Sequence, residues 1–479
     1  MSNLLARGWP PEHPKVVRAQ GRTLWTEEGE ELLDGASGAL AATVGYGVSQ
    51  VAKAVGRQAR ELAFAHSLHF TTAEAEAYGE ELAEAIKGQS AHPMSRILLV
   101  PGGSEANEMA LILARRIQAL RGEPRRDLFL SRHLSYHGST LATIALGARH
   151  SLRSPIEPLV SPVAHLPPPY PYRPEWNVRF PDAVAGVHGL ADVMGAALTE
   201  DALRRGRSDP AEAVAVAIEA LEGRVCAFVA EPIIGASGGA IVPPDDYWPR
   251  VQRICQAHGV LLIADEVMTG MGRTGDWLAS HHWGLEPDII TLGKGLAGGY
   301  VPLGAMATRE EHWQLLRREA PGFPFGFTFA QHPVAAAAGR AVLALLREGD
   351  LPSRAEALGR QIRGRLEDAL RHHPHVGEVR GRGLLTGVEL VQDTVSRSPF
   401  PAEWNATGRL LRAARDEGLL LYPARGGADG VSGDAVLLAP ALTTTDEEAE
   451  VMVDAALLAI NGVAAAWEKV GGNEPRSAG

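Results

Sequence analysis

The distribution of apolar residues along the chain predicts strands and helices in alternation. Apolar residues form nearly continuous runs at 226–235, 260–270 and 288–299, without the polar alternation of a half-exposed strand. Strands that are apolar at successive positions are typical of a parallel sheet with helices on both faces. Segment 73–88 instead repeats its apolar residues at helical spacing. The pattern therefore predicts an α/β protein with a large, mostly parallel sheet covered by helices.

The two ends of the chain predict a second, smaller domain. A chain of 479 residues exceeds the size of one ordinary core. Residues 15–35 contain two strand-like runs separated by a polar turn, which predicts a hairpin. After about residue 335, an Ala-rich helix leads into further strand-like and helical segments. We expect an N-terminal segment (1–60) packed with a C-terminal α+β domain (336–479), and a large domain (61–335) between them.

One segment of the predicted large domain lacks a regular pattern. Residues 165–176, HLPPPYPYRPEW, are rich in proline and aromatic side chains. This composition predicts an irregular surface segment, either a lid or an interface element. The polar C-terminal tail, 471–479, is expected to be disordered.

Charge and composition argue against several classes of partner. The net charge of −11 disfavours nucleic acids and anionic membranes, which both attract basic surfaces. No continuous apolar run approaches the roughly 18 residues that span a bilayer, and the N-terminus lacks the apolar core of a signal peptide. The two cysteines, Cys226 and Cys255, suit neither a disulfide framework nor a metal site. We therefore expect a cytoplasmic protein without a metal.

Lysine is scarce in this chain, which makes Lys294 conspicuous. Only five of the 46 basic residues are lysines, so the other 41 are arginines. Lys294 lies between glycines directly after an apolar run, with no neighbouring charge in the sequence. A lysine that forms an imine with an aldehyde needs such partial desolvation. By itself the position fits a solvated loop lysine equally well.

Three other positions supply complementary chemistry. Asp265 ends the apolar run LLIAD. A carboxylate buried there needs a partner, such as a protonated pyridine nitrogen. A role as a helix N-cap or in a structural ion pair would satisfy the carboxylate as well. Gly103 and Ser104 begin a helix, where free N–H groups bind anions or simply form a capped turn. Tyr136 follows another strand-like run and could stack on a planar ring or only pack. Together these positions match the needs of pyridoxal 5'-phosphate (PLP).

The order of these motifs resembles that of the class III (ω-type) aminotransferases, which are PLP-dependent enzymes of fold type I. The resemblance covers nearly the whole chain. It rests on the motifs GGSEANE (102–108), SYHGST (135–140), EPIIGASGG (231–239), LLIADEVMTGMGRTG (261–275), TLGKGLAGGYVPLGA (291–305), FTFAQHPVAAAA (327–338) and VRGRGLLTGVEL (379–390).

This resemblance implies roles for individual residues. Lys294 corresponds to the Schiff-base lysine, and Asp265 to the partner of the pyridine nitrogen. Thr328 resembles the threonine that reaches the phosphate of the neighbouring subunit's cofactor, which implies a homodimer with shared active sites, or a dimer of such dimers. The other implied cofactor contacts are Gly103, Ser104, Tyr136, His137, Glu231 and Val267.

The resemblance also implies the reaction. An amino group would pass from an amine or ω-amino donor to a keto acid such as pyruvate by a ping-pong mechanism, with Lys294 moving the proton. An aminomutase or a decarboxylating transaminase would use the same lysine and aspartate. A purely binding role is disfavoured because each implied cofactor contact carries suitable chemistry.

Departures from the family pattern concern the substrate. Ornithine and γ-aminobutyrate transaminases carry a switching glutamate where this chain has Ala236, so it resembles the amine:pyruvate-type enzymes more closely. Leu40 lies near a position where many of those enzymes have tryptophan. Arg425 is the candidate for binding a substrate carboxylate, and Tyr422 is the alternative occupant of that place.

Overall fold

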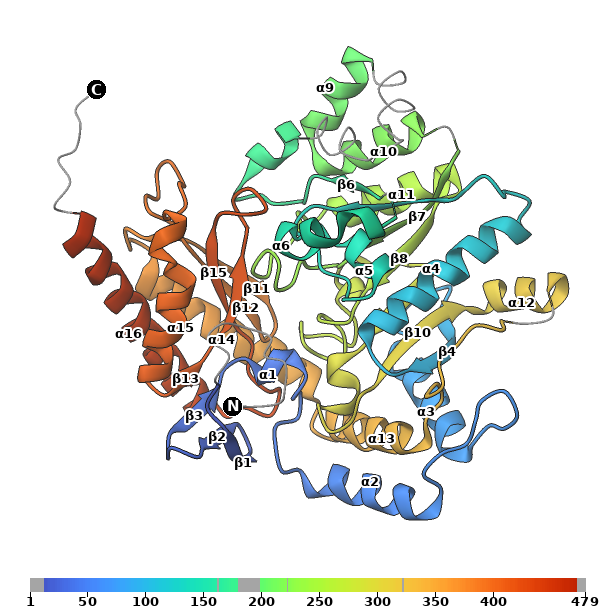
Figure 1. Ribbon diagram of the computed structural model, residues 1–479, viewed down its shortest axis with the longest axis horizontal. Helices are drawn as coiled ribbons and strands as arrows, with labels where there is room; N and C mark the ends of the chain where they lie inside the picture. Colours follow the sequence, from blue (N-terminus) through green and yellow to red (C-terminus); the bar gives the residue numbers. More distant parts are fainter. Residues whose placement is uncertain (1–12, 162, 180–198, 222, 321–322, 472–479) are drawn as a thin grey trace.

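The computed structural model describes residues 13–161, 163–179, 199–221, 223–320 and 323–471. A large body built on a seven-stranded sheet lies beside a smaller body that contains the first and the last of the described residues (Figure 1). The tail for which we predicted disorder falls almost entirely outside the described residues.

The large sheet has the mostly parallel character that the apolar runs predict. Strand β10 is antiparallel to both of its neighbours, and the remaining neighbouring pairs are parallel. All residues of β7, β8 and β9 are buried, because helices cover both faces. The strands in spatial order are β4 (Met94–Val100), β10 (Gly304–Arg309), β9 (Ile289–Leu292), β8 (Leu261–Asp265), β7 (Val225–Ala230), β5 (Leu128–Arg132) and β6 (Ala164–Leu166).

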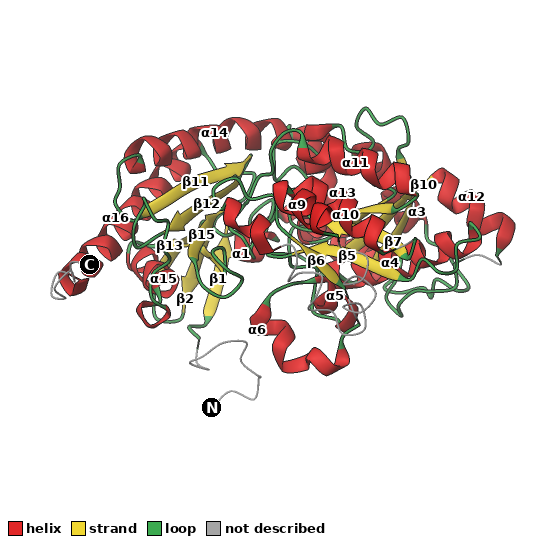
Figure 2. Ribbon diagram, turned by 90° about the horizontal axis from the view of Figure 1, so that it is seen from above, coloured by secondary structure: helices red, strands yellow, loops and turns green. Residues whose placement is uncertain are grey.

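Helices lie on both faces of this sheet (Figure 2), and successive residues of a strand pack on opposite faces. Leu261 and Ile263 share a core with helix α4 (Gly103–Leu120), whereas Leu262 packs with α10 (Pro210–Ala220) and α11 (Tyr247–His258). Because side chains alternate along a strand, an apolar run is required to fill both layers. The α/β fold class is thus confirmed. The remaining helices of this body include α5 (Leu141–Leu146), α6 (His150–Arg153), α9 (Glu200–Ser208) and α12 (Glu310–Glu319).

The N-terminal segment forms two successive hairpins, and the prediction of a single hairpin was wrong. Its strands are β1 (Val16–Gln20), β2 (Thr23–Thr26) and β3 (Glu31–Asp34). Gly29, at a positive φ of 90°, closes the second turn, which sequence periodicity alone did not reveal. The short strand β13 (Leu419–Leu420) pairs in parallel with β3, so the two ends of the chain are joined in one sheet.

The rest of the smaller body is an antiparallel sheet covered by helices. The strand order is β11 (Val376–Arg382), β12 (Leu385–Leu390), β15 (Asp434–Leu438) and β14 (Tyr422–Arg425). The helices are α14 (Leu351–Leu370), α15 (Ala406–Asp416) and α16 (Asp446–Gly471).

Helix α13 (Pro333–Glu348) crosses the domain boundary predicted at residues 335 and 336. It packs against α2 (Ser49–Glu61), α3 (Ala73–Ala85) and the turn that carries Lys294. By its contacts the whole helix therefore lies with the large body. The exact division into domains stays a prediction.

Within α16, the stretch Asp446–Val470 is long and apolar enough to cross a membrane, alone among the described helices. Half of its most apolar window is buried, and the helix packs against α14 and α15. These contacts are those of a core helix in the smaller body. The packing of α16 therefore accounts for its length and its apolar composition.

Residues 165–176, which we call the strap, are largely buried rather than lying on the surface as predicted. Tyr170 and Trp176 fill a core with Leu134, Ile234 and Ile241. The prolines lack an N–H group, so this irregular backbone leaves few unpaired donors when it is buried. The strap therefore lies between the large sheet and the C-terminal sheet.

Candidate active site

Lys294 begins a short 3-10 helix (Lys294–Ala297) directly after β9. Its φ of +40° places a residue with a Cβ in the left-handed region, a strained conformation that is common at functional sites. Burial lowers the pKa of the Lys294 ammonium, and the carboxylates of Asp265 and Glu231 partly oppose that shift. The structure thus provides a lysine with an increased fraction of the free amine.

Asp265, the last residue of β8, is a buried carboxylate with three hydrogen-bond donors. Oδ2 lies 2.7 Å from Nδ1 of His137 and accepts a 2.8 Å bond from Nδ2 of Asn107. Oδ1 accepts a 3.0 Å bond from the backbone N–H of Val267. An ionised carboxylate accepts only, so Nδ1 of His137 carries the proton in this pair. These bonds hold the carboxylate in one orientation.

Asn107 is a site residue that the sequence analysis did not single out. It lies one turn into α4, and it also donates to the His137 carbonyl oxygen at 2.8 Å. Its Oδ1 accepts a 2.9 Å bond from the hydroxyl of Thr291. The available signal in the sequence was an asparagine on the predicted helix that follows the glycine turn. His137, predicted as a cofactor contact, lies between Asp265 and Ser131, with Nε2 3.3 Å from the serine hydroxyl.

Two turns meet at the start of α4. The N–H groups of the first helical turn, Gly103 and Ser104 among them, have no acceptor within the helix. The Ser104 hydroxyl accepts a 3.1 Å bond from the N–H of Ser139. A Cβ on Gly138 would lie 2.5 Å from that hydroxyl, so only glycine allows this approach. The partly buried Tyr136 bonds to Ser139 at 3.0 Å between the hydroxyl oxygens.

Val267 lies against the backbone of both glycine turns. A Cβ added to Gly103 would come within 2.7 Å of Val267 Cγ1, and one added to Gly293 within 3.1 Å. The absence of side chains at these two positions brings three segments from β4, β8 and β9 together at one edge of the sheet. In parallel sheets this edge, beyond the carboxyl ends of the strands, is where ligands bind.

Glu231 lies directly after β7 and is buried beside Asp265. Its Oε1 accepts a 3.1 Å bond from the N–H of Gly235, but Oε2 has no hydrogen-bond partner within the described chain. Burial raises the pKa of this carboxyl. A buried oxygen without a partner indicates a place where a further polar group would be accommodated.

A group of packed apolar side chains, which we call the pocket wall, lies next to this site. It consists of Leu40, Ala236, Met268 and Tyr422, which pack in one cluster. Met268 follows Asp265 by three residues, and the short helix that ends at Leu40 packs on the turn of Lys294. Arg425 is exposed on β14 and donates a 2.7 Å bond to Asn405 instead. The structure thus brings Leu40 and Tyr422 together but leaves Arg425 outside the wall.

A family model for the class III aminotransferases matches residues 5–460. The chain belongs to the class III aminotransferase family. It is a PLP-dependent enzyme that transfers amino groups between small-molecule amines and keto acids. The alternative reactions, by an aminomutase or a decarboxylating transaminase, find no support among the relatives.

Relatives match the aminotransferase over nearly its full length. A putrescine–pyruvate aminotransferase of Pseudomonas aeruginosa is 33% identical over 94% of this chain and 91% of its own. The aminotransferase YodT of Bacillus subtilis is 34% identical over 92% of this chain and 93% of its own. The PLP-bound crystal structure of an amine transaminase from an uncultivated Pseudomonas species is 32% identical. It superposes with a TM-score of 0.82, covering 97% and 98% of the two chains.

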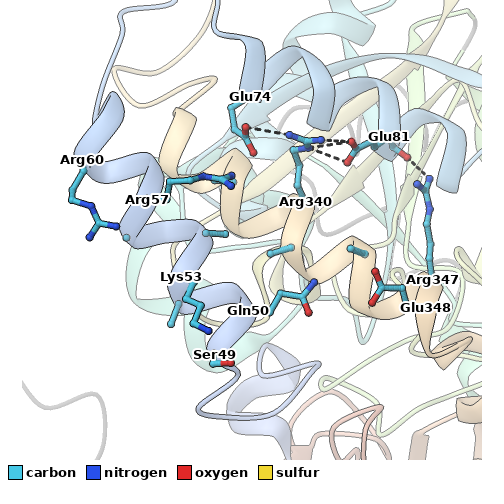
Figure 3. Close-up of a pocket in the computed structure, with 16 residues that line it drawn as sticks. Ser49, Gln50, Lys53, Arg57, Arg60, Glu74, Glu81, Arg340, Arg347 and Glu348 are labelled. Atoms are coloured by element: carbon cyan, nitrogen blue, oxygen red, sulfur yellow. Dashed lines mark hydrogen bonds and ion pairs between the residues drawn. The ribbon is translucent and has the colours of Figure 1, made fainter.

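A large cavity of the aminotransferase is lined by other residues than Lys294. It has a volume of about 1260 Å³ and opens between α2 and α13 (Figure 3). Arg340 in this cavity is paired with Glu74 and Glu81 at 3.1 and 2.6 Å. None of the predicted site residues lines it, so its size does not identify the chemistry.

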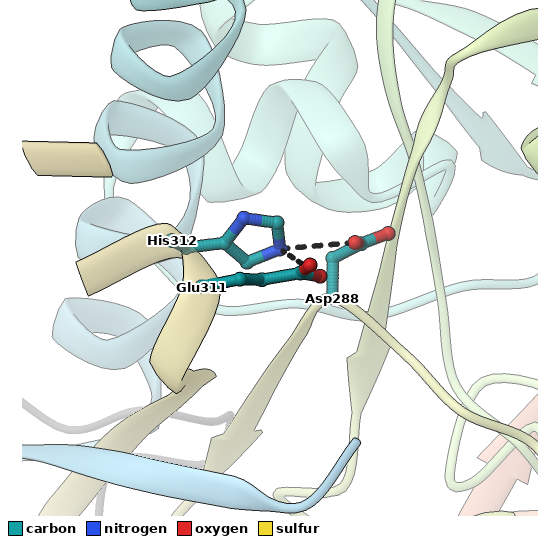
Figure 4. Close-up of side chains that lie close together, drawn as sticks. All are labelled: Asp288, Glu311 and His312. Atoms are coloured by element: carbon teal, nitrogen blue, oxygen red, sulfur yellow. Dashed lines mark hydrogen bonds and ion pairs between the residues drawn. The ribbon is translucent and has the colours of Figure 1, made fainter. Parts of the chain in front are cut away.

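A group of potential metal ligands also lies outside the site. Asp288, Glu311 and His312 approach one another at the far side of the sheet (Figure 4). The guanidinium of Arg309 lies 3.5 Å from the Asp288 carboxylate and 3.3 Å from that of Glu311. Because this cation already balances the carboxylates, the cluster is explained as an ion-pair network.

Proposed function

We propose that this aminotransferase moves an amino group from an amine or ω-amino donor to a keto acid such as pyruvate, with Lys294 and Asp265 as catalytic residues. The observation that carries the proposal is the convergence of Lys294, Asp265 and Glu231 beside an apolar pocket wall. Ala236 stands in that wall at the position where ornithine and γ-aminobutyrate transaminases carry the switching glutamate. A relative named for putrescine and pyruvate supports the same substrate class.

The residues present fit PLP. The free N–H groups at the start of α4 suit its phosphate. Val267, held closely against Gly103 and Gly293, offers an apolar side chain for one face of the ring. The unpartnered Oε2 of Glu231 marks space for a polar group next to Asp265. We propose Gly103, Ser104, Tyr136 and Val267 as the residues that hold the cofactor, with His137 acting through Asp265.

When bound, PLP supplies an aldehyde that condenses with primary amines and a ring that accepts the electron pair of a substrate carbanion. Asp265, oriented by His137 and Asn107, keeps the ring nitrogen protonated. The free amine of Lys294 removes the proton from the donor's reacting carbon and returns it to the cofactor carbon, as base and then acid. The ping-pong reaction runs in two halves, in which the first carbonyl product leaves before the keto acid binds.

The donor and acceptor are tested directly with purified enzyme, PLP, putrescine and pyruvate. We expect stoichiometric formation of alanine and consumption of the diamine, measured by liquid chromatography. Replacing putrescine by glutamate is expected to reduce the rate at least tenfold, because the wall offers no charged partner for a second carboxylate. A preference for glutamate, or alanine formation that requires release of carbon dioxide, would contradict the proposal.

We further propose that the enzyme is a homodimer with shared active sites. Thr328 is exposed and lies in a groove that also contains Leu68, Phe70 and Phe325. None of the residues around Asp265 and Lys294 lines this groove. The aromatic ring of Phe329, 58% exposed, packs edge-on against Phe64 at 6.0 Å. An exposed apolar patch of this kind favours a protein partner. A second copy would cover the patch and bring Thr328 to the partner's phosphate.

The double variant Leu68→Asp/Phe329→Asp is expected to dissociate the dimer, because each subunit would bury two uncompensated carboxylates. The molar mass measured by light scattering after size exclusion should fall from about twice the chain mass to 50.9 kDa. Transaminase activity should fall with it, since Thr328 would no longer reach the second site. The control is Val395→Asp, at a still more exposed apolar residue outside the patch. A monomeric wild-type enzyme with full activity would refute the shared site.

A further inference from the structure

A buried ion network connects the strap to the C-terminal sheet. Its centre is Glu389 on β12, whose two carboxylate oxygens are occupied by three donors. Oε1 accepts a 2.7 Å bond from Nε of Arg173, and Oε2 accepts a 2.7 Å bond from NH1 of Arg380. The hydroxyl of Tyr170 also donates to Oε2. All four side chains are at most 8% exposed.

Burying such charges brings little net stability. The desolvation of a buried ion pair roughly cancels its attraction, and apolar side chains of similar size would stabilise the fold as well. The fixed directions of its hydrogen bonds instead hold the side chains of the network in one arrangement. Burial opposes the charge, yet the two guanidinium groups hold the pKa of Glu389 below its usual value, so the carboxylate stays ionised.

Arg380 extends this network to the loop that carries Ala236. Its Nε donates to the carbonyl oxygen of Gly239 and its NH2 to that of Gly238, both at 2.7 Å. A Cβ on Gly387 would clash with the Gly239 oxygen, so strand β12 also touches this loop. The loop begins at Glu231 and returns at Ile241, whose backbone bonds to that of Ile234 at 3.0 Å in both directions.

We propose that Arg380 is a positioning residue for substrate specificity, which fixes the 235–240 loop and with it the pocket wall at Ala236. The strap holds Glu389 through Tyr170 and Arg173, and Glu389 holds the Arg380 guanidinium flat against the two carbonyl groups. The proposal rests on the proposed function only in taking Ala236 as part of the substrate pocket. It gives the strap a function that its sequence did not reveal.

The variants Arg380→Met and Arg380→Lys test this role in the PLP-loaded enzyme. Met removes these three bonds and a fourth, of 2.8 Å, to Glu378. Lys keeps the charge beside Glu389 but cannot donate to both glycine carbonyls in one plane. We expect Arg380→Met to raise the KM for the amine donor by about tenfold with kcat changed less than about threefold, the pattern of lost uniform binding. Arg380→Lys should give an intermediate KM.

The second readout is hydrogen exchange of the backbone amides 235–241, followed by mass spectrometry. These amides should exchange at least about tenfold faster in both variants, because the loop opens locally without its anchor. The matched control is Arg371→Met, which removes an exposed pair with Asp368 of 2.6 Å. It should change neither KM nor exchange at the loop.

The outcomes separate this inference from the proposed function. If the wild-type enzyme turns over no amine donor, the proposed function fails. Hydrogen exchange of amides 235–241 still tests whether Arg380 holds the loop. If Arg380→Lys leaves both the KM and the exchange of residues 235–241 at wild-type values, the positioning role is refuted. The same holds if kcat falls while KM is constant. If Arg380→Met does not fold, the KM and the loop exchange of Arg380→Lys alone test the positioning role.

Discussion

Lys294→Ala is expected to abolish the transaminase reaction and the absorbance near the visible edge that a covalent lysine–PLP link produces. A positioned proton donor and acceptor contributes about 10² to 10⁴ to the rate. In the proposed mechanism Lys294 also binds the cofactor covalently, so we expect a loss of at least about 10⁴-fold. The measurement pairs steady-state alanine formation with an absorbance spectrum of the PLP-treated protein.

Lys53→Ala is the matched control for this variant. Lys53 is exposed on α2 and lines the cavity between α2 and α13, which contains none of the predicted site residues. Both the spectrum and the rate should be unchanged. Full turnover by Lys294→Ala, or loss of the absorbance band in Lys53→Ala, would show that the imine forms elsewhere.

Asp265→Asn is expected to lower kcat by about 10² to 10³-fold, the range for removing one preorganised electrostatic contact from an active site. The amide oxygen of asparagine can still accept the bonds from His137 and Asn107, but the amide NH2 then faces the N–H of Val267 and that bond is lost. The fold should be preserved with a somewhat lower melting temperature. The negative charge that keeps the ring nitrogen protonated is lost. The measurement is the rate of the first half-reaction with a saturating amine, together with the melting temperature.

Glu266→Gln provides the contrast, because Glu266 is the adjacent carboxylate. Its oxygens accept bonds from Ser280 (2.7 Å from the backbone N–H and 2.6 Å from the hydroxyl) and from the Ala279 N–H at 3.0 Å. This variant should lower stability by about 1–3 kcal/mol, through buried donors left with a weaker acceptor. Its effect on the half-reaction should be small. The reverse pattern would exchange the roles of the two carboxylates.

The neighbouring pair Asp265 and Glu266 shows how far the sequence reaches. The run LLIAD followed by glutamate indicates that a carboxylate stands at the ligand-binding edge of the sheet. Which of the two faces the ligand depends on the alternation of side chains at the last strand residue. In the structure, Glu266 accepts hydrogen bonds from the backbone N–H groups of the next short helix. Asp265 is instead bonded to His137 and Asn107.

Asn107 and the strap were missed for related reasons. An asparagine within a helix and a Pro-rich segment carry no local signal of burial. Their partners, Thr291 for the former and Glu389 for the latter, lie more than 180 residues away in the chain. The two hairpins at the N-terminus were missed because the turn between the second and third strands depends on the left-handed backbone of Gly29.

The sequence by itself determined the class of fold, the family and the order of the glycine turn, Asp265 and Lys294 along successive strands, because hydrophobic runs and motif spacing are local properties. Only the tertiary structure decided which side chains meet. It placed His137 and Asn107 behind Asp265, assembled the pocket wall from Leu40, Met268 and Tyr422, and left Arg425 outside it. Those contacts follow from sheet order and from glycine positions that permit close approach, and both depend on segments far apart in the chain.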